Sequence, residues 1–486
     1  MRIWGLALVL VTSTAFAHVG SPDVYFQSDA GPYHLLITVN PPAMIPGVAQ
    51  VQIRLMSGNA DSITIAPIYV NGKDQGLPPA ADAMQQSAGD PHWFAGKVWL
   101  MESGVWELHA DVAGPQGMGT LVMPVPAYAR RTLPMQQSLG ALLFALMLLL
   151  AVGIISIAGA ATREGILPPA VTPSPRNLRH GRSAIQVAAV LVAAILALGN
   201  WWWNAQAAEL KRTMLYNAPP LEVGFQADQL TLKMDENFWH QTRKDQWSMN
   251  LIPDHGHLMH LFLLRVPAMD RFYHLHPEQI SEGLFRVKLP AISSGDYKVF
   301  ADIVRATGFP ETMVSEITFP DVTGEPFSGD DSGVSTSAFE PPPQLTTASP
   351  LADGGRMIWE RDGTALRAGE VNWFRFRVED ADHKPVDDLE TYMGMSGHAE
   401  FVRSDLSVFA HIHPAGSVPM ASLMIAQKDS GLAVDHRSMN NRTSEKLSAE
   451  ISFPYGFPQA GDYRLFIQVK RHGLVETGVF DAHAQN

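Results

Sequence analysis

The sequence predicts a mainly β protein with three immunoglobulin-like or cupredoxin-like β-sandwich modules and a two-helix transmembrane hairpin. Short segments that alternate apolar and polar residues, separated by turn clusters, recur through residues 18–130, 204–320 and 357–482. Two longer apolar stretches lie between the first and second of these regions. The last two regions also share sequence, which indicates an internal repeat of one structural unit.

The N-terminus is typical of a secretory signal peptide over residues 1–17. Arg2 supplies the positive charge, Gly5 to Val11 form an apolar segment, and Ala15-Phe16-Ala17 is a small-x-small cleavage site. Cleavage there would leave His18 as the first residue of an exported protein, while an uncleaved anchor is the alternative.

Two uncharged apolar stretches, residues 138–160 and 184–203, are long enough to cross a bilayer. The second ends in Trp201-Trp202-Trp203, which suits a membrane–water interface. With an exported N-terminus, the short basic loop of residues 161–183 would lie in the cytoplasm. We therefore expect a bacterial inner-membrane protein whose N- and C-terminal regions lie in the periplasm. The apolar stretches have no ionisable residue, so we do not expect this chain to transport ions alone.

The two C-terminal regions are copies of one repeat, joined by a Ser/Thr/Pro-rich linker over residues 321–356. The clearest shared motif is Gly-Asp-Tyr-x-x-Phe, which begins at Gly295 in the first copy and at Gly461 in the second. Glu311-Thr312 recurs beyond it as Glu476-Thr477. The two copies should therefore have the same fold.

Histidines occupy matching places in the two copies. His260 precedes His274-Leu275-His276-Pro277 in the first, and His398 precedes His411-Ile412-His413-Pro414 in the second. Residues i and i+2 of a strand project from one face, so the two imidazoles of each His-x-His pair should lie side by side. We predict one metal site per copy; surface or hydrogen-bonded histidines are the alternative.

The copies differ where His255 and His257 align with Met393 and Met395. Thioether sulfur favours Cu(I), while imidazole accepts Cu(I), Cu(II) and zinc. We therefore expect copper at both repeat sites, with a stronger Cu(I) preference at the second; zinc is possible. Methionines that only fill the core are the alternative. His255 and His257 would either join the first site or form a separate one.

The first module has its own candidate site. After cleavage, His18 would offer an amino nitrogen and an imidazole to Cu(II), and Asp90-Pro91-His92 could supply the remaining ligands. These features resemble the CopC family of periplasmic copper-binding proteins, and the resemblance implies that His18, Asp90 and His92 bind Cu(II). The Gly-Val-Trp-Glu-Leu stretch at residues 104–108 is also similar to FixH/YtkA-like accessory domains.

Composition narrows the function further. A net charge of −13 argues against nucleic-acid partners, and the absence of cysteine excludes disulfides, thiol nucleophiles and cysteine-ligated copper or iron–sulfur sites. We expect a non-enzymatic, membrane-anchored protein that acquires or stores copper or delivers it to a membrane or periplasmic cuproenzyme or transporter. The alternatives are a copper-dependent oxidoreductase with an N-terminal His site and an assembly or sensor subunit that binds zinc or no metal. The expected metal ligands are His18, Asp90, His92, His255, His257, His260, His274, His276, Met393, Met395, His398, His411 and His413.

Overall fold

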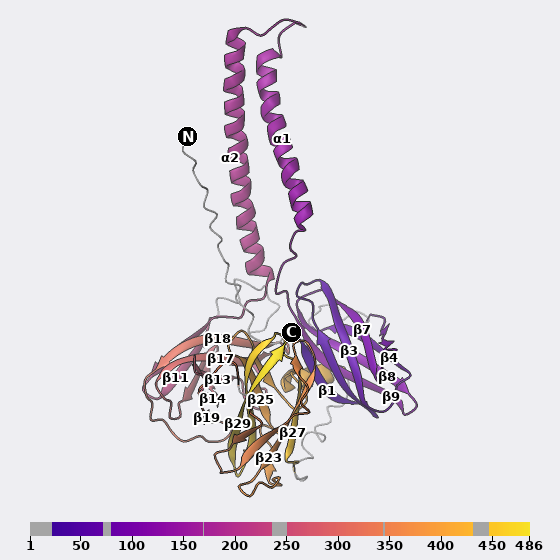
Figure 1. The fold of residues 1–486 in the computed structure, drawn as a ribbon, viewed down its shortest axis with the longest axis vertical. Helices are drawn as coiled ribbons and strands as arrows, with labels where there is room; N and C mark the ends of the chain where they lie inside the picture. Colours follow the sequence, from indigo (N-terminus) through magenta and orange to yellow (C-terminus); the bar gives the residue numbers. More distant parts are fainter. Residues whose placement is uncertain (1–21, 71–78, 169, 236–249, 344–345, 431–446) are drawn as a thin grey trace. The chain divides into compact units, whose positions relative to one another are not determined.

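The computed structural model describes residues 22–70, 79–168, 170–235, 250–343, 346–430 and 447–486 (Figure 1). The predicted signal peptide and His18 lie outside the described residues. The chain divides into two compact units, one formed by Ala129–Asn217 and the other by the residues before and after it. The prediction of a mainly β protein is confirmed, since strands make up most of the second unit.

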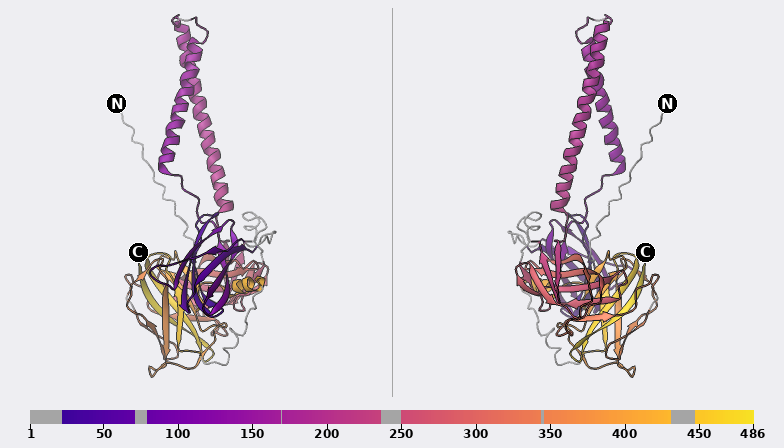
Figure 2. Two further views of the ribbon diagram at one scale, coloured as in Figure 1. Left: turned by 90° about the vertical axis from the view of Figure 1, so that its right-hand side faces the viewer. Right: turned by 90° about the vertical axis from the view of Figure 1, so that its left-hand side faces the viewer.

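The smaller unit consists of two long helices, α1 (Gln137–Glu164) and α2 (Pro175–Met214), which lie side by side in Figure 2. Both are apolar and long enough to be candidate membrane spans, and they contain the two predicted stretches. Ser174 caps α2, because its hydroxyl accepts a hydrogen bond from the Asn177 N–H at 3.2 Å. The helices cross closely at Gly159, where a Cβ atom would lie 2.5 Å from Ile185. The connection between them is shorter than the predicted loop, because both helices extend into it.

The first β module is built from two antiparallel sheets with the strand orders β1-β2-β3-β7-β6 and β5-β4-β8-β9. Alternate residues of both sheets, such as Ile37, Ile53 and Leu108, enter one shared core, which makes the module sandwich-like. Its strands are β1 (Val24–Ala30), β2 (Tyr33–Asn40), β3 (Gly47–Ser57), β4 (Ser62–Tyr69), β5 (Asp82–Ala83), β6 (Gln85–Gln86), β7 (Trp93–Leu100), β8 (Gly104–Gly114) and β9 (Gly117–Ala127).

The second β module also has two sheets around one core. Their strand orders are β10-β11-β16-β15 and β12-β17-β13-β14-β19, and β18 pairs with β17. Strand β19 belongs to the stretch predicted as a linker, and it pairs with β14 through His274 and Ser332. The strands are β10 (Leu221–Gln226), β11 (Gln229–Met234), β12 (Leu251–Ile252), β13 (His260–Val266), β14 (Arg271–Leu275), β15 (Glu278–Ser281), β16 (Leu284–Lys288), β17 (Gly295–Arg305), β18 (Pro310–Phe319) and β19 (Ser332–Ser335).

The third β module repeats this plan with the sheets β20-β21-β23-β27 and β22-β29-β28-β25-β26, and β24 pairs with β28. Strands β13, β14, β17 and β18 of the second module correspond to β25, β26, β28 and β29 here. The elements are β20 (Ala348–Pro350), β21 (Arg356–Glu360), β22 (Leu366–Arg367), β23 (Asn372–Glu379), β24 (Leu389–Glu390), β25 (His398–Arg403), β26 (Phe409–Ile412), α4 (Met420–Asp429), β27 (Glu450–Tyr455), β28 (Gly461–Arg471) and β29 (Leu474–Gln485).

The two repeat modules pack against each other through equivalent faces. Phe272 stacks on Phe466 with ring centroids 4.1 Å apart, and Phe300 stacks on Phe409 at 4.2 Å, both with an interplanar angle of 11°. Phe272 is equivalent to Phe409 in the repeat, and Phe300 to Phe466. Each stack therefore becomes the other when the modules are exchanged, which is the pattern of an isologous, two-fold interface. This buried aromatic interface lies next to the histidines.

Candidate metal centre

Eight histidines from the two repeat modules form one contiguous group, which we call the histidine cluster. Contacts that join the two modules include His260 with His411, whose ring centroids lie 5.4 Å apart, and His255 with His413, at 4.8 Å. His257 joins the group through His276, at 3.9 Å. The members are His255, His257, His260, His274, His276, His398, His411 and His413.

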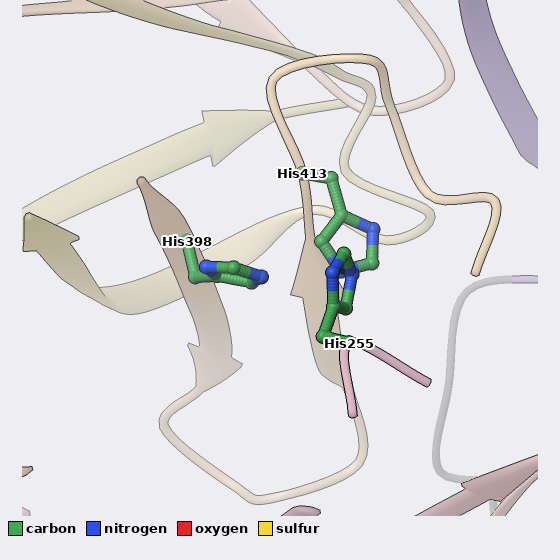
Figure 3. Close-up of side chains that lie close together, drawn as sticks. All are labelled: His255, His398 and His413. Atoms are coloured by element: carbon green, nitrogen blue, oxygen red, sulfur yellow. Dashed lines mark hydrogen bonds between the residues drawn. The ribbon is translucent and has the colours of Figure 1, made fainter. Parts of the chain in front are cut away.

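Two triads within the cluster could hold a metal ion. In each, one ring nitrogen of every histidine lies within 4.8 Å of the others. Site A comprises His260, His274 and His276, all from the second module. Site B comprises His255, His398 and His413, and therefore combines a ligand from the second module with two from the third (Figure 3).

A tight turn carries His255 into site B. Asp254 and His257 exchange backbone hydrogen bonds of 2.8 and 2.9 Å, and His255 between them has a φ of 53°, in the left-handed region. A non-glycine residue there costs roughly 1–2 kcal/mol. The same turn recurs at Tyr392–Met395, where Met393 has a φ of 51°. The structure thus supports the alignment of His255 with Met393.

Contacts with the first module fix the turn that follows His413. His413 and Gly416 exchange backbone hydrogen bonds, both 2.8 Å long, and the Gln27 N–H of β1 donates to the Ala415 carbonyl at 2.7 Å. Gly416 has a φ of 120°, and a Cβ atom there would lie 2.0 Å from the Tyr25 carbonyl oxygen. Only glycine fits this approach, so the first module helps to position a site B ligand.

Hydrogen bonds determine which nitrogen of each site A ring carries the proton. The His260 Nε2–H donates to the Asp254 carbonyl at 3.1 Å, because a carbonyl oxygen can only accept. His274 Nδ1 lies 2.9 Å from the Gln468 Oε1 amide oxygen and therefore donates to it. His276 Nδ1 lies 2.9 Å from a carboxylate oxygen of Asp331, so this nitrogen carries the proton too. All three rings consequently present their unprotonated nitrogen to the site.

The proton assignment creates an unfavourable contact unless a cation is bound. His260 Nδ1 and His274 Nε2 lie 3.1 Å apart, and each is the unprotonated nitrogen of its ring. Two lone pairs cannot form a hydrogen bond with each other. A metal ion bound by both nitrogens would remove this repulsion. The oxygen acceptors behind the rings also match the usual surroundings of metal-bound imidazoles, since they fix ring orientation and raise ligand basicity.

Site B has a related arrangement. The His255 Nδ1–H donates to the Met393 carbonyl at 2.9 Å, which directs the unprotonated Nε2 toward His413 Nε2 at 3.3 Å. His398 is fully buried, and neither of its ring nitrogens has a hydrogen-bond partner. An unsatisfied buried polar group costs about 1–3 kcal/mol, so a bound cation would stabilise this site as well.

Burial keeps the six rings of the two triads neutral. It lowers the pKa values of His260, His274, His398 and His413 well below the ordinary 6.5, and those of His255 and His276 to a smaller extent. Electrostatic repulsion between neighbouring rings lowers these pKa values further. Neutral imidazole is the form that binds metal, so at pH 7 little free energy is needed to deprotonate the ligands.

Glu400 and Asp302 are further carboxyl groups near the histidine cluster. Glu400 is fully buried without a hydrogen-bond partner, and its Oε1 lies 3.9 Å from His274 Nδ1. Burial, together with Asp302, raises the Glu400 pKa well above its ordinary 4.5. Burial thus disfavours the charged forms of both Glu400 and His274, which weakens any ion pair between them. Asp302 lies 3.5 Å from His411 Nδ1.

The structure regroups the predicted ligands of the second repeat site. We expected His398, His411 and His413 to share a metal, but His255 takes the place of His411. The reason is local: β26 ends at Ile412, and the turn after it carries His413 toward His255, while His411 Nδ1 faces Asp302. His255 therefore lies together with His398 and His413 and not with the histidines of site A. His257 lies beside site A with its Nε2 3.3 Å from Asp330.

The other predicted ligands have different surroundings. Met393 is 9 % exposed and Met395 is half-buried, and the Met393 backbone carbonyl accepts a hydrogen bond from His255. In the first module, the Asp90 Oδ1 accepts a hydrogen bond of 2.9 Å from the His92 backbone N–H, which stabilises the turn between them. The third expected ligand there, His18, lies outside the described residues.

The sequence interpretation missed the residues that orient the rings. Gln468 and Asp302 are equivalent in the repeat and lie opposite His398 and His260 on the neighbouring strands. Each contacts a histidine of the other module. The sequence did contain a signal, because Asp302 and Gln468 each interrupt a run of apolar residues, 299–304 in the first copy and 465–469 in the second.

One family model matches part of this chain, and several solved structures match it with low similarity. Residues 351–486 match a family described as a domain of unknown function (DUF8832). A search of curated proteins gave no match. Among solved structures, an engineered protein is 13 % identical over 19 % of this chain and 20 % of its own, with a TM-score of 0.15. Escherichia coli alpha-2-macroglobulin is 10 % identical over 96 % and 31 %, with a TM-score of 0.17. Latent PorU from Porphyromonas gingivalis is 8 % identical over 96 % and 34 %, with a TM-score of 0.15. The chain thus spans about a third or less of these proteins, and TM-scores this low do not indicate a shared fold.

Proposed function

We propose that this chain is a membrane-anchored copper-binding protein of the bacterial periplasm, which acquires or stores copper or delivers it to a membrane or periplasmic cuproenzyme or transporter. The observation that carries the proposal is the pair of unprotonated nitrogens on His260 and His274, 3.1 Å apart in a site from which water is largely excluded. An ion that prefers imidazole would remove this repulsion.

The donor set favours copper over the other common ions. Calcium and magnesium prefer oxygen ligands, whereas both triads consist of imidazoles alone. Copper exceeds zinc in intrinsic affinity for nitrogen sites of this kind. Methionines at the same interface would favour copper further, because thioether sulfur binds Cu(I). Zinc is the competing metal.

The wider architecture fits this role under the proposal. The two apolar helices would anchor the chain, and the three β modules, of immunoglobulin-like or cupredoxin-like type, would lie in the periplasm. The first module would hold Cu(II) through His18, Asp90 and His92, as its resemblance to the CopC family implies. Buried sites with several histidines suit metal binding and transfer.

Metal analysis of the full chain, purified in detergent, tests the proposal. We expect at least two copper ions per chain after equilibration with an equimolar mixture of copper and zinc followed by desalting. Replacement of His260 and His274 together by Ala should remove one copper ion, since both belong to site A. A preparation that retains zinc, or no metal, under these conditions would refute the copper assignment.

A matched control addresses folding. His472 and His483 lie outside the cluster and are exposed at 62 % and 53 % of their side chains. Their joint replacement by Ala should leave the copper content unchanged. A loss of copper in this control equal to that in the His260/His274 variant would show that the effect is not specific to site A.

A further inference from the structure

The two halves of the histidine cluster have nearly the same geometry. Each module contributes three histidines in equivalent positions, so every distance within one set has a counterpart in the other. The ring centroids of His260 and His276 lie 5.0 Å apart, as do those of His398 and His413. The His260–His274 and His398–His411 distances are both 5.4 Å. The His274–His276 and His411–His413 distances are 4.6 and 4.7 Å.

The symmetry extends to the turns that precede these histidines. The ring centroid of His255 lies 5.0 Å from that of His398 and 4.8 Å from that of His413, and both of these histidines belong to the opposite module. Its equivalent, Met393, has the same left-handed backbone and is 9 % exposed. The two turns touch, because the His255 Nδ1–H donates to the Met393 carbonyl. In the repeat, His260 and His276 of site A are equivalent to His398 and His413 of site B, and Met393 is equivalent to His255. The two-fold relation therefore predicts that Met393 lies beside His260 and His276, as His255 lies beside His398 and His413.

We propose that the Met393 thioether completes site A from the opposite module, which makes site A the Cu(I) site and site B the Cu(II) site. This inference rests on the proposed copper-binding function. It differs from the sequence-based expectation, which assigned the softer site to the ligands of the third module. Sulfur is a soft ligand and stabilises Cu(I), so three imidazoles with one thioether favour the reduced ion.

The residue before each of these two positions strengthens the contrast. Asp254 precedes His255, and its Oδ2 lies 3.9 Å from His255 Nε2, so site B has a carboxylate next to its imidazoles. The equivalent of Asp254 is Tyr392, whose hydroxyl donates to the Asp330 carbonyl at 2.9 Å and is not a charged ligand. The same turn thus gives site B an imidazole and a nearby hard oxygen, whereas it gives site A a thioether.

X-ray absorption of the full chain loaded with one equivalent of Cu(I) tests the assignment. We expect a copper–sulfur contribution in the native protein that is lost in Met393→Leu and retained in Met395→Leu, the matched control from the same turn. Competition with a Cu(I) chelator should show a Cu(I) affinity lowered at least about tenfold in Met393→Leu, the lower limit for losing an outer partner of a metal ligand. Leucine conserves the volume of methionine, so the fold should be retained.

A second variant keeps the test independent of the effect of Met393→Leu on folding. Met393→His would give site A a fourth imidazole, and it should raise the ratio of Cu(II) to Cu(I) affinity at that site. Sulfur absent from the native spectrum, or still present in Met393→Leu, would overturn the inference and leave copper binding itself intact. A native chain that binds no copper would instead refute both the inference and the proposed function.

Discussion

Gln468 offers the sharpest single test of how site A is held. Its side chain is fully buried, and its amide oxygen accepts the hydrogen bond from His274 Nδ1 at 2.9 Å across the interface between the repeat modules. In Gln468→Leu this acceptor is gone, while the Tyr392 hydroxyl at 3.2 Å remains as a weaker partner. The ring would then be free to rotate or to change its protonated nitrogen.

The expected changes in stability and metal affinity follow from the loss of the His274–Gln468 hydrogen bond. A buried donor left without its acceptor costs about 1–3 kcal/mol, which should appear as a lower unfolding free energy of the metal-free protein. Removing the partner that orients a metal-bound imidazole typically lowers metal affinity by about 10- to 100-fold. We expect both effects at site A and a smaller change at site B, because His398 lies opposite Gln468 on the neighbouring strand but its ring nitrogens have no hydrogen-bond partner.

Copper affinity is measured by chelator competition, and unfolding by tryptophan fluorescence during heating. Gln468→Glu is the rescue variant, because a carboxylate oxygen can accept the same hydrogen bond and should preserve affinity. Asp302→Asn is the symmetry control: it alters the equivalent residue, which lies opposite His260 but whose carboxylate lies 3.5 Å from His411, a histidine outside both triads. An unchanged affinity in Gln468→Leu, or an equal loss in Asp302→Asn, would refute the role assigned to Gln468.

Two further predictions concern pH and packing. The lowered pKa values of the triad histidines mean that the unfolded chain binds more protons below pH 6.5, so metal-free stability should be complete above that pH and should fall as the pH decreases toward 5. Thermal unfolding from pH 7.5 to 5 measures this, and a flat profile would contradict the assignment of neutral rings. Phe409→Ala removes a ring that is 2 % exposed and stacked on Phe300, and should cost roughly 3–5 kcal/mol. We expect Phe409→Ala to weaken copper binding at site B, because this site takes ligands from both modules. If chelator competition gave the native copper affinity at site B, the Phe300–Phe409 stack would not be what holds the modules together.

The sequence was sufficient for the elements with regular periodicity and for the repeat. The apolar stretches predicted the helices, and the alternation of apolar and polar residues predicted long strands such as β3 and β8. Strand β19 was not predictable, because Ser332–Ser335 is short and polar and is a strand only by pairing with β14. In such segments tertiary pairing outweighs local preference.

The histidines that belong to the cluster were predictable, but their grouping was not. A repeat alignment identifies equivalent residues, such as His260 with His398, and says nothing about which copies touch. Near a two-fold axis, a residue can contact both its own counterpart and other residues of the partner module. His255 contacts the Met393 carbonyl and also the rings of His398 and His413. The left-handed backbone at His255 directs its ring across the interface, and local sequence preferences do not predict this conformation.

The shared ligands couple metal binding to docking of the repeat modules. Site B takes His255 from one module and His398 and His413 from the other, so an ion bound there stabilises the docked arrangement over any undocked one. At a free ion concentration 100 times the dissociation constant, this stabilisation is about 2.7 kcal/mol. By the same linkage, any partner that separates the modules would weaken site B by an equal free energy. Opening the aromatic interface would then release copper from site B. The histidines of site A all belong to one module, so site A would lose only its contacts with the opposite module.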